Sequence, residues 1–265
     1  MKLFDGTLLA MELRRSYKGV LIWTLAISAS LVMVIAIYPL VIDMYAAIPP
    51  EFYDLMAAFG GIPDTIVEYY ATEGAMMLQL FGSLFAALQG FGAINRDERE
   101  KTAESLYSLP LSRMTFYCTK LLRVTLEVVF LCGVTALFSY IGFLIIDEPI
   151  DYPPFILFSV LNTLVFLVFA WLCFAMAALL KPNQKPMAAI AIPFVLYVIY
   201  TIAMMTQNEV LDLLKYITPF TFADPVEILK TDFQLEWISM TVFLGLTVFG
   251  TVAGWKAFAR REFTI

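Results

Sequence analysis

Long apolar stretches alternate with short charged segments along the whole chain. The apolar stretches fall approximately at residues 20–42, 74–94, 121–146, 155–180, 187–206 and 236–258. Each is close to the ~20 residues that a helix needs to cross about 30 Å of hydrocarbon. A membrane β-barrel would instead alternate apolar and polar residues along each strand. The pattern therefore predicts an all-α membrane protein, with six transmembrane helices in a single domain over residues 1–265.

Composition supports a lipid environment and argues against an enzyme. Apolar residues make up 61% of the chain and charged residues only 15%. The sequence contains no histidine, which removes histidine-based acid/base catalysis, histidine metal ligands and serine–histidine nucleophilic pairs. Cys118, Cys132 and Cys173 are interpreted as packing residues, because two fall inside predicted spans. We expect no cofactor, no metal and no catalytic residue.

The basic residues predict how the helices are oriented. If the six spans are correct, fifteen of the seventeen Lys and Arg residues lie in segments on one side of the membrane, and only Lys215 and Lys230 lie on the other. Because cytoplasmic loops carry the excess of Lys and Arg, both termini are predicted to be cytoplasmic. The net charge of −6 then reflects sidedness, and no nucleic-acid partner is expected.

The outer segments contain short amphipathic pieces. Apolar residues recur at helical spacing between two prolines and two glycines, which predicts an interfacial helix at Phe52, Leu55, Met56 and Phe59. The same spacing recurs at Val210, Leu213, Leu214 and Ile217. Asp224, Pro225 and Glu227 then read as an N-cap, a first-turn proline and a capping-box acid. These short outer helices are expected to plug or brace the bundle, with an external gate as the alternative.

Small residues mark positions where helices can approach closely. Gly82, Ala86 and Gly90 lie four residues apart on one face of the second span, and Gly250 with Gly254 forms a GxxxG pattern on the sixth. We expect these five residues to mediate helix packing. Spacing alone leaves open whether the contact lies within one subunit or between two.

The loop between the second and third spans, residues 95–113, is densely charged and ends near a proline. Its i,i+4 pairs mix supportive Asp97–Lys101 with repulsive Glu100–Glu104, so the charges are not arranged simply to stabilise a helix. Two interpretations stay open from the residues alone. The segment is either a short helix that docks on a soluble partner or a solvated loop that satisfies the positive-inside rule.

This loop resembles the cytoplasmic loop of ABC-2-type transporter permeases of bacteria. Members typically show an acidic cluster, then Gly/Lys-Thr-x-Glu, then a Leu-Leu-Ser-x-Pro-x-Ser-Arg run. Here the matching residues are Glu98, the run Thr102-Ala103-Glu104 and the run Ser108-Leu109-Pro110-Leu111-Ser112-Arg113. Two further segments, residues 69–74 and 258–263, also resemble this family. The chain differs in carrying Lys101 where glycine is common.

The resemblance implies a permease subunit of an ATP-driven exporter in the plasma membrane. Its loop would be a coupling helix seated in a separate ATP-binding cassette subunit, because the printed sequence holds no GxxxxGK[ST] motif. Two permease and two ATPase subunits would form the working unit, with the path lined mainly by the first, second and fifth spans. The expected partner contacts, carried over from the family loop, are Glu98, Glu100, Thr102, Glu104, Leu106 and Pro110.

Two further features bear on this interpretation. The N-terminus places Leu3, Phe4, Leu8 and Met11 against charged residues, as expected for a connecting helix on the inner leaflet or an ordinary basic anchor. Glu127 is the one carboxylate deep in a predicted span, and Arg123 lies one turn before it. A local ion pair is favoured there over a transport or proton site.

Three other functions remain as alternatives. An ion-coupled secondary carrier would place functional charges or broken helices near the midplane, and the chain shows neither convincingly. A membrane-embedded enzyme lacks a serine, cysteine or carboxylate constellation. A membrane scaffold or sensor would keep the docking loop without transport. The substrate stays open, although the scarcity of polar residues within spans favours an amphipathic or hydrophobic cargo.

Overall fold

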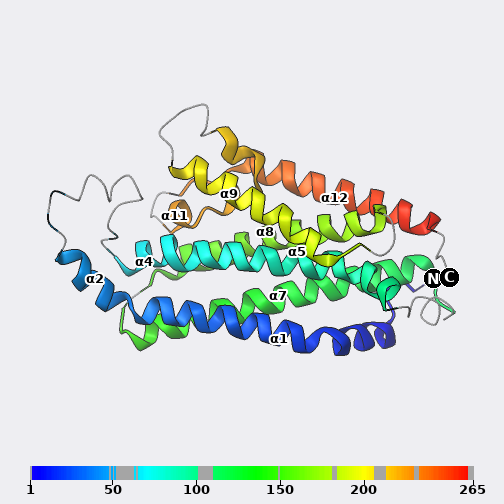
Figure 1. Ribbon diagram of the computed structural model, residues 1–265, viewed down its shortest axis with the longest axis horizontal. Coiled ribbons are helices and arrows are strands. Elements are labelled where there is room, and N and C mark those ends of the chain that lie inside the picture. The colour runs from blue at the N-terminus through cyan, green and yellow to red at the C-terminus, as the bar shows by residue number, and fades with distance from the viewer. Residues whose placement is uncertain are drawn as a thin grey trace.

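The computed structural model of the chain is an elongated bundle of long helices (Figure 1). It describes residues 2–47, 49, 51, 63, 65–100, 110–148, 150–180, 184–205, 213–229 and 233–261. Every regular element within these ranges is helical. The elements are α1 (Gly6–Ala36), α2 (Tyr38–Ala46), α4 (Ile66–Tyr69), η2 (Tyr70–Ala75), α5 (Met76–Arg99), α7 (Arg113–Ile145), α8 (Tyr152–Leu179), η3 (Pro186–Ile190), α9 (Ala191–Met205), η4 (Leu213–Ile217), η5 (Pro219–Ala223), α11 (Pro225–Ile228) and α12 (Trp237–Arg260).

Six helical segments of the described chain are long and apolar enough to cross a membrane, as the sequence predicted. They are Gly6–Ala36, Ile66–Asp97, Arg113–Ile145, Tyr152–Leu179, Pro186–Met204 and Trp237–Arg260. Both termini lie at the same end of the bundle (Figure 1).

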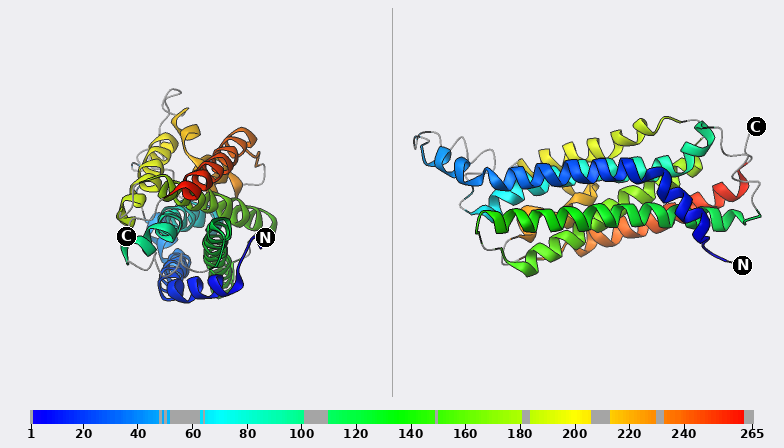
Figure 2. Two further views of the ribbon diagram at one scale, coloured as in Figure 1. Left: turned by 90° about the vertical axis from the view of Figure 1, so that its right-hand side faces the viewer. Right: turned by 90° about the horizontal axis from the view of Figure 1, so that it is seen from below.

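The first spanning helix begins much earlier than the apolar pattern indicated. α1 runs without a break from Gly6 to Ala36, and the carboxylate of Asp5 caps its start by accepting a hydrogen bond from the N–H of Leu8. The amphipathic segment predicted to be a connecting helix or a basic anchor therefore forms the opening turns of α1. Its opening turns stand at an angle to the rest (Figure 2, right). The amphipathic pattern is only partly used for packing. Leu8 is buried, whereas Leu3, Phe4 and Met11 are exposed.

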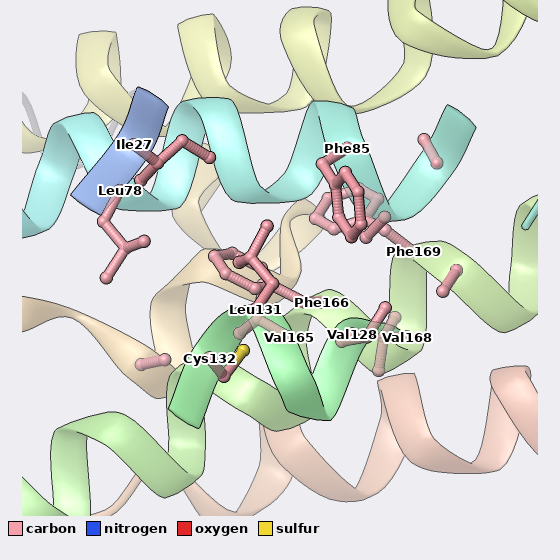
Figure 3. Close-up of a cluster of buried hydrophobic side chains, with 14 of the residues drawn as sticks. Ile27, Leu78, Phe85, Val128, Leu131, Cys132, Val165, Phe166, Val168 and Phe169 are labelled. Atoms are coloured by element: carbon pink, nitrogen blue, oxygen red, sulfur yellow. The ribbon is translucent and has the colours of Figure 1, made fainter. Parts of the chain in front are cut away.

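α8 occupies the centre of the bundle and packs against α5, α7 and α12, while α1 packs along α7. One face of α8 is buried against these helices, and its exposed face is also apolar, with Ile156, Val160 and Leu179 exposed, as a helix that meets lipid requires. The core between α5, α7 and α8 is filled by large side chains (Figure 3). It includes Phe85, Val128, Leu131, Phe166 and Phe169.

Glycines let these helices approach closely. A Cβ atom at Gly90 of α5 would lie 2.0 Å from the carbonyl oxygen of Ala170 in α8, so the backbones nearly touch there. At Gly82 the same atom would meet the ring of Phe166, and Ala86 between them is fully buried. On α12, Gly254 lies against Ala175 of α8 and Gly250 against Leu172. The structure thus places all five small residues at helix contacts within one subunit.

The segment after α9 folds into the far end of the bundle rather than lying on its surface. Residues 219–225 are buried, and the side chain of Asp224 caps α11 by accepting hydrogen bonds from the N–H groups of Val226 and Glu227, as predicted. Phe220 packs against the rings of Phe169, Tyr197 and Tyr200. The amide of Gln79 on α5 donates to the carbonyl of Ala223, 2.6 Å away. This segment therefore braces α5, α8 and α9 together.

The other predicted outer helices are described only in part. The Phe52–Phe59 segment and Val210 lie outside the described residues. Leu213 and Ile217 begin and end η4, a short 3₁₀ helix; both side chains are exposed, whereas Leu214 is partly buried.

Candidate functional site

The loop that resembles a coupling segment joins two long helices at the end of the bundle that holds both termini. We call this the basic end; its described residues are 2–18, 95–100, 110–123, 184–185 and 256–261. α5 ends at Arg99, and α7 begins at Arg113 with Ser112 as its N-cap. Residues 101–109 lie outside the described part of the chain.

A buried lysine joins three helices at this end. Lys120 on α7 is fully withdrawn from solvent, and its Nζ atom lies 2.5 Å from Oε1 of Glu12 on α1 and 2.6 Å from Oδ2 of Asp97 on α5. Glu12 and Asp97 are only 2% and 1% exposed. A buried charge requires a compensating partner, so these three residues tie the first turns of α1, the last turns of α5 and the start of α7 into one cluster.

Arg15 extends this cluster toward solvent. Its two terminal nitrogens lie 2.8 Å from Asp97 and 2.5 Å from Glu100, so one guanidinium joins α1 to the last turn of α5 and to the first residue after it. Glu100 is also within 3.4 Å of Arg96. Glu100 is the residue at which the described part of α5 leads into the loop. The charges therefore connect the root of the loop directly to α1.

A second pair lies one to two turns deeper in α7. Arg123 and Glu127 form the predicted i,i+4 ion pair at 3.4 Å, and both are nearly fully buried. The hydroxyl of Ser16 on α1 donates to the carboxylate of Glu127. Arg123 also donates to the carbonyl of Gln89 on α5, 3.2 Å away. This pair links the same three helices as Lys120 does. We call Glu12, Arg15, Asp97, Lys120, Arg123 and Glu127 together the charge cluster.

The C-terminal helix is fastened to the same end. One nitrogen of Arg113 donates to the carbonyls of Phe258, Ala259 and Arg261 at 2.6–3.4 Å. Arg261 in turn donates to the carbonyl of Ala177 at 2.9 Å, near the end of α8. Cations at these positions satisfy carbonyl groups that have no partner within a helix terminus. The start of α7 and the ends of α8 and α12 are thus held together.

The comparison with protein families identifies the architecture. The description that matches residues 7–263 is ABC-2 family transporter protein, and it covers nearly the whole chain. The chain belongs to this ABC-2 family. It is therefore a multi-pass membrane permease of the ABC transporter class, as its loop motif indicated. A comparison with curated proteins gave no match.

The residues expected to contact a partner of this ABC-2 permease are only partly described. Thr102, Glu104 and Leu106, and the side chain of Glu98, lie outside the described residues. Pro110 is exposed at the far side of the loop, where α7 is about to begin. Glu100 is half-exposed and already engaged by Arg15 and Arg96. Through its ion pair with Arg15, Glu100 anchors the start of the loop to α1.

Sequence reasoning missed most of the charge cluster of the permease. It found Arg123 with Glu127 because their spacing is local. It treated Arg15 as part of a polar surface and did not single out Glu12 or Lys120. A signal was present, since Lys120 stands near the start of a long apolar run, where a charge is expected to have a partner. Among the described residues, no cluster of three His, Cys, Asp or Glu side chains could hold a metal ion.

Proposed function

We propose that this permease is the membrane subunit of an ATP-driven exporter, and that a separate ATP-binding cassette subunit docks on residues 96–113. The family match supports the permease assignment, and the loop motif supports the docking position. No GxxxxGK[ST] phosphate-binding loop occurs in the printed residues, and the proposal assigns ATP binding to the partner subunit.

The charge cluster is the observation that carries this proposal. Force applied to the loop reaches the end of α5 first, where Asp97 is held by Arg15 of α1 and Lys120 of α7. These contacts are buried and charge-assisted, so separating them would leave charges without partners in a poorly solvated place. The ends of α1, α5 and α7 would therefore move as a unit when the partner moves the loop. This is the mechanical connection that a two-state gate driven by a docked ATPase requires.

The basic end would face the cytoplasm of a cell whose plasma membrane holds the permease. The Lys and Arg excess at that end supports this orientation. It also supports the docking position, because a soluble ATPase must reach the loop from the cytoplasm. In the working unit, two permeases would pair with two ATPases. By resemblance to the family, the path would lie between the permeases, along the first, second and fifth spans.

Co-purification in mild detergent, with the chain expressed alongside the ATPase subunits of its host, tests the proposal. The tagged wild-type permease should recover ATPase activity, and the variant carrying Glu98→Arg and Glu104→Arg should lose it. A matched control reverses two exposed acids at the opposite end of the bundle, Glu148→Arg with Asp151→Arg. This control should retain the activity. Absence of a bound ATPase in every preparation would overturn the proposal in favour of a carrier or scaffold.

A further inference from the structure

An apolar groove lies between α8, α9 and α12. α9 and α12 stand on the side of the bundle away from α1 (Figure 1). Its volume is about 300 Å³. Leu172 and Leu179 line it from α8, Ile192 and Leu196 from α9, and Phe243 from α12. None of these side chains carries a polar atom, so the groove has no means of binding a polar solute by hydrogen bonds.

The groove is open at the outer surface of the bundle, where a single permease crossing the membrane would meet lipid. α9 and α12 both cross the membrane, and each keeps most of its surface away from the rest of the bundle. α9 packs on α5 and α12 packs on α8, and the groove is lined by side chains of all three helices α8, α9 and α12. Large apolar side chains next to the groove, such as Val195 and Phe194, are exposed. An unfilled apolar groove at this depth would be filled by hydrocarbon, because water is absent from the bilayer core.

The groove has the depth of one membrane leaflet. Its α8 residues run from Val168 to Leu179, which corresponds to roughly 16 Å along a helix axis. This is about half of the ~30 Å hydrocarbon thickness. Phe243 of α12 and Pro219 of the buried η5 segment lie at the inner end of the groove. Leu179 and Ile192 stand near the basic end. An acyl chain entering from the leaflet at the basic end would thus end at the bilayer midplane.

The basic end, toward which the groove extends, carries exposed positive charge. Lys185 directly precedes η3, and Lys256 and Arg260 lie in the last turns of α12. All three side chains are exposed. Basic residues at the surface of a bilayer attract anionic lipid headgroups. Position and charge therefore select a lipid with a negatively charged headgroup over a zwitterionic one.

We propose that the groove between α8, α9 and α12 binds one acyl chain of an anionic phospholipid from the leaflet at the basic end, with its phosphate near Lys185, Lys256 and Arg260. The bound lipid fills space that no side chain of this subunit fills, and it joins α9 and α12 to α8. The site lies apart from the charge cluster, and it shares α9, the fifth span, with the path expected along the first, second and fifth spans. It depends on the membrane location and not on the proposed ATPase.

Native mass spectrometry of the purified permease tests the chain site. The permease, delipidated in detergent and then supplied with dipalmitoyl phosphatidylglycerol, should retain one lipid per chain. Leu196→Trp should fill the groove and lower retention about tenfold, because even a few methylene groups excluded from an apolar site weaken binding that much. Val195→Trp is the matched control, since this neighbouring side chain is exposed and does not line the groove. It should retain the lipid.

A second, chemically different change covers the possibility that Leu196→Trp fails to fold. Gly250→Leu projects into the groove from α12, where the nearest atom belongs to the flexible side chain of Leu172. Gly245→Leu is its control on the same helix, because no atom lies within 4 Å of the added Cβ. Equal retention by all four variants and wild type would show only non-specific lipid around the protein and would overturn the proposal.

The headgroup is tested with dipalmitoyl phosphatidylcholine, which has the same chains without net charge. Wild type should prefer phosphatidylglycerol several-fold. The variant Lys185→Gln, Lys256→Gln and Arg260→Gln should lose that preference while still retaining a lipid. Equal retention of both lipids by wild type would overturn the assignment of an anionic headgroup.

Discussion

The Nζ atom of Lys120 on α7 lies 2.6 Å from Oδ2 of Asp97 on α5, and both side chains are almost completely withdrawn from solvent. The same ammonium group contacts Glu12 of α1 at 2.5 Å. One buried cation thus links three membrane helices at the root of the loop on which we expect the ATPase to dock. The following predictions test this arrangement and the packing that supports it.

Replacing Lys120 by methionine should strongly destabilise the permease. The change leaves Glu12 and Asp97 buried without their shared cation, which costs about 3–5 kcal/mol for a buried ion pair. Thermal unfolding in detergent, followed by tryptophan fluorescence, measures the loss. Adding Glu12→Gln and Asp97→Asn to the same variant should recover much of the stability, because no buried charge is then left over. If Lys120→Met alone were as stable as wild type, the prediction would be contradicted, and the cluster would be well solvated.

Replacing Glu127 by glutamine should affect stability more than coupling. Glutamine keeps an oxygen that can accept from Ser16 but removes the charge that faces Arg123, at a cost of about 1–3 kcal/mol. Thermal unfolding measures that cost, and ATP turnover of the co-purified complex should stay close to wild type. Loss of turnover in a stable, fully assembled variant would instead make Glu127 a residue of the transport mechanism.

Replacing Arg15 by glutamine should weaken recovery of the ATPase more than it weakens the fold. Arg15 is partly exposed and positions Glu100 at the root of the loop, so its loss frees the loop while leaving the buried Lys120 contacts in place. The stability loss should stay near 1 kcal/mol, as for partly exposed ion pairs. The neighbouring Arg14→Gln is the control, since Arg14 is exposed. Equal ATPase recovery by both variants would argue against a positioning role.

Replacing Gly90 by alanine should separate α5 from α8. The added Cβ atom would fall 2.0 Å from the carbonyl oxygen of Ala170, and backbone cannot move aside as a side chain can. Overpacking of this kind costs about 1–3 kcal/mol, measured by thermal unfolding. Gly92→Ala on the same helix should be neutral or slightly stabilising, because nothing lies within 4 Å of its Cβ. Similar unfolding temperatures for the two variants would contradict the close approach.

Stability should also depend on pH through Asp224, which lies outside the spanning segments. Burial raises the pKa of the Asp224 carboxyl above its ordinary value, with the charge of Glu227 acting in the same direction. Because the folded protein then binds this proton more tightly than the unfolded chain does, lowering the pH toward about 4 should stabilise wild type. Asp224→Asn keeps an oxygen to cap α11 but cannot titrate. As the pH falls, the stability of wild type should therefore rise relative to that of Asp224→Asn. A stability difference that does not change with pH would contradict the raised pKa.

Local patterns predicted the helices well, but not every boundary. The apolar run suggested that the first span starts near residue 20, whereas α1 starts at Gly6. The opening turns of α1 are charged, so hydropathy alone placed the start of this helix too late. What extends the helix into the cluster is the pairing of Glu12 and Arg15 with residues more than 80 positions away, which no local window detects.

The sequence likewise predicted some parts of the candidate site and not others. The loop motif between Arg96 and Arg113 could be recognised because its residues are contiguous in sequence. The pair Arg123–Glu127 could be predicted because residues four apart lie about one helical turn apart. The apolar groove could not be predicted from the sequence, because its lining residues come from four separate elements, α8, α9, α12 and η5. A set of ordinary apolar residues has no signature until packing leaves a space between them.

The sequence by itself determined that this protein has six membrane-crossing helices, that nearly all of its basic residues gather at one end, and that its loop is of the ABC-2 type. These properties follow from length, periodicity and contiguous motifs, which are local. Only the tertiary structure decided that Lys120 joins Glu12 to Asp97, that residues 219–225 fold into the bundle, and that α9 and α12 leave a groove over α8. These depend on which helix faces lie together, and that choice is made by close packing and by the need of each buried charge for a partner.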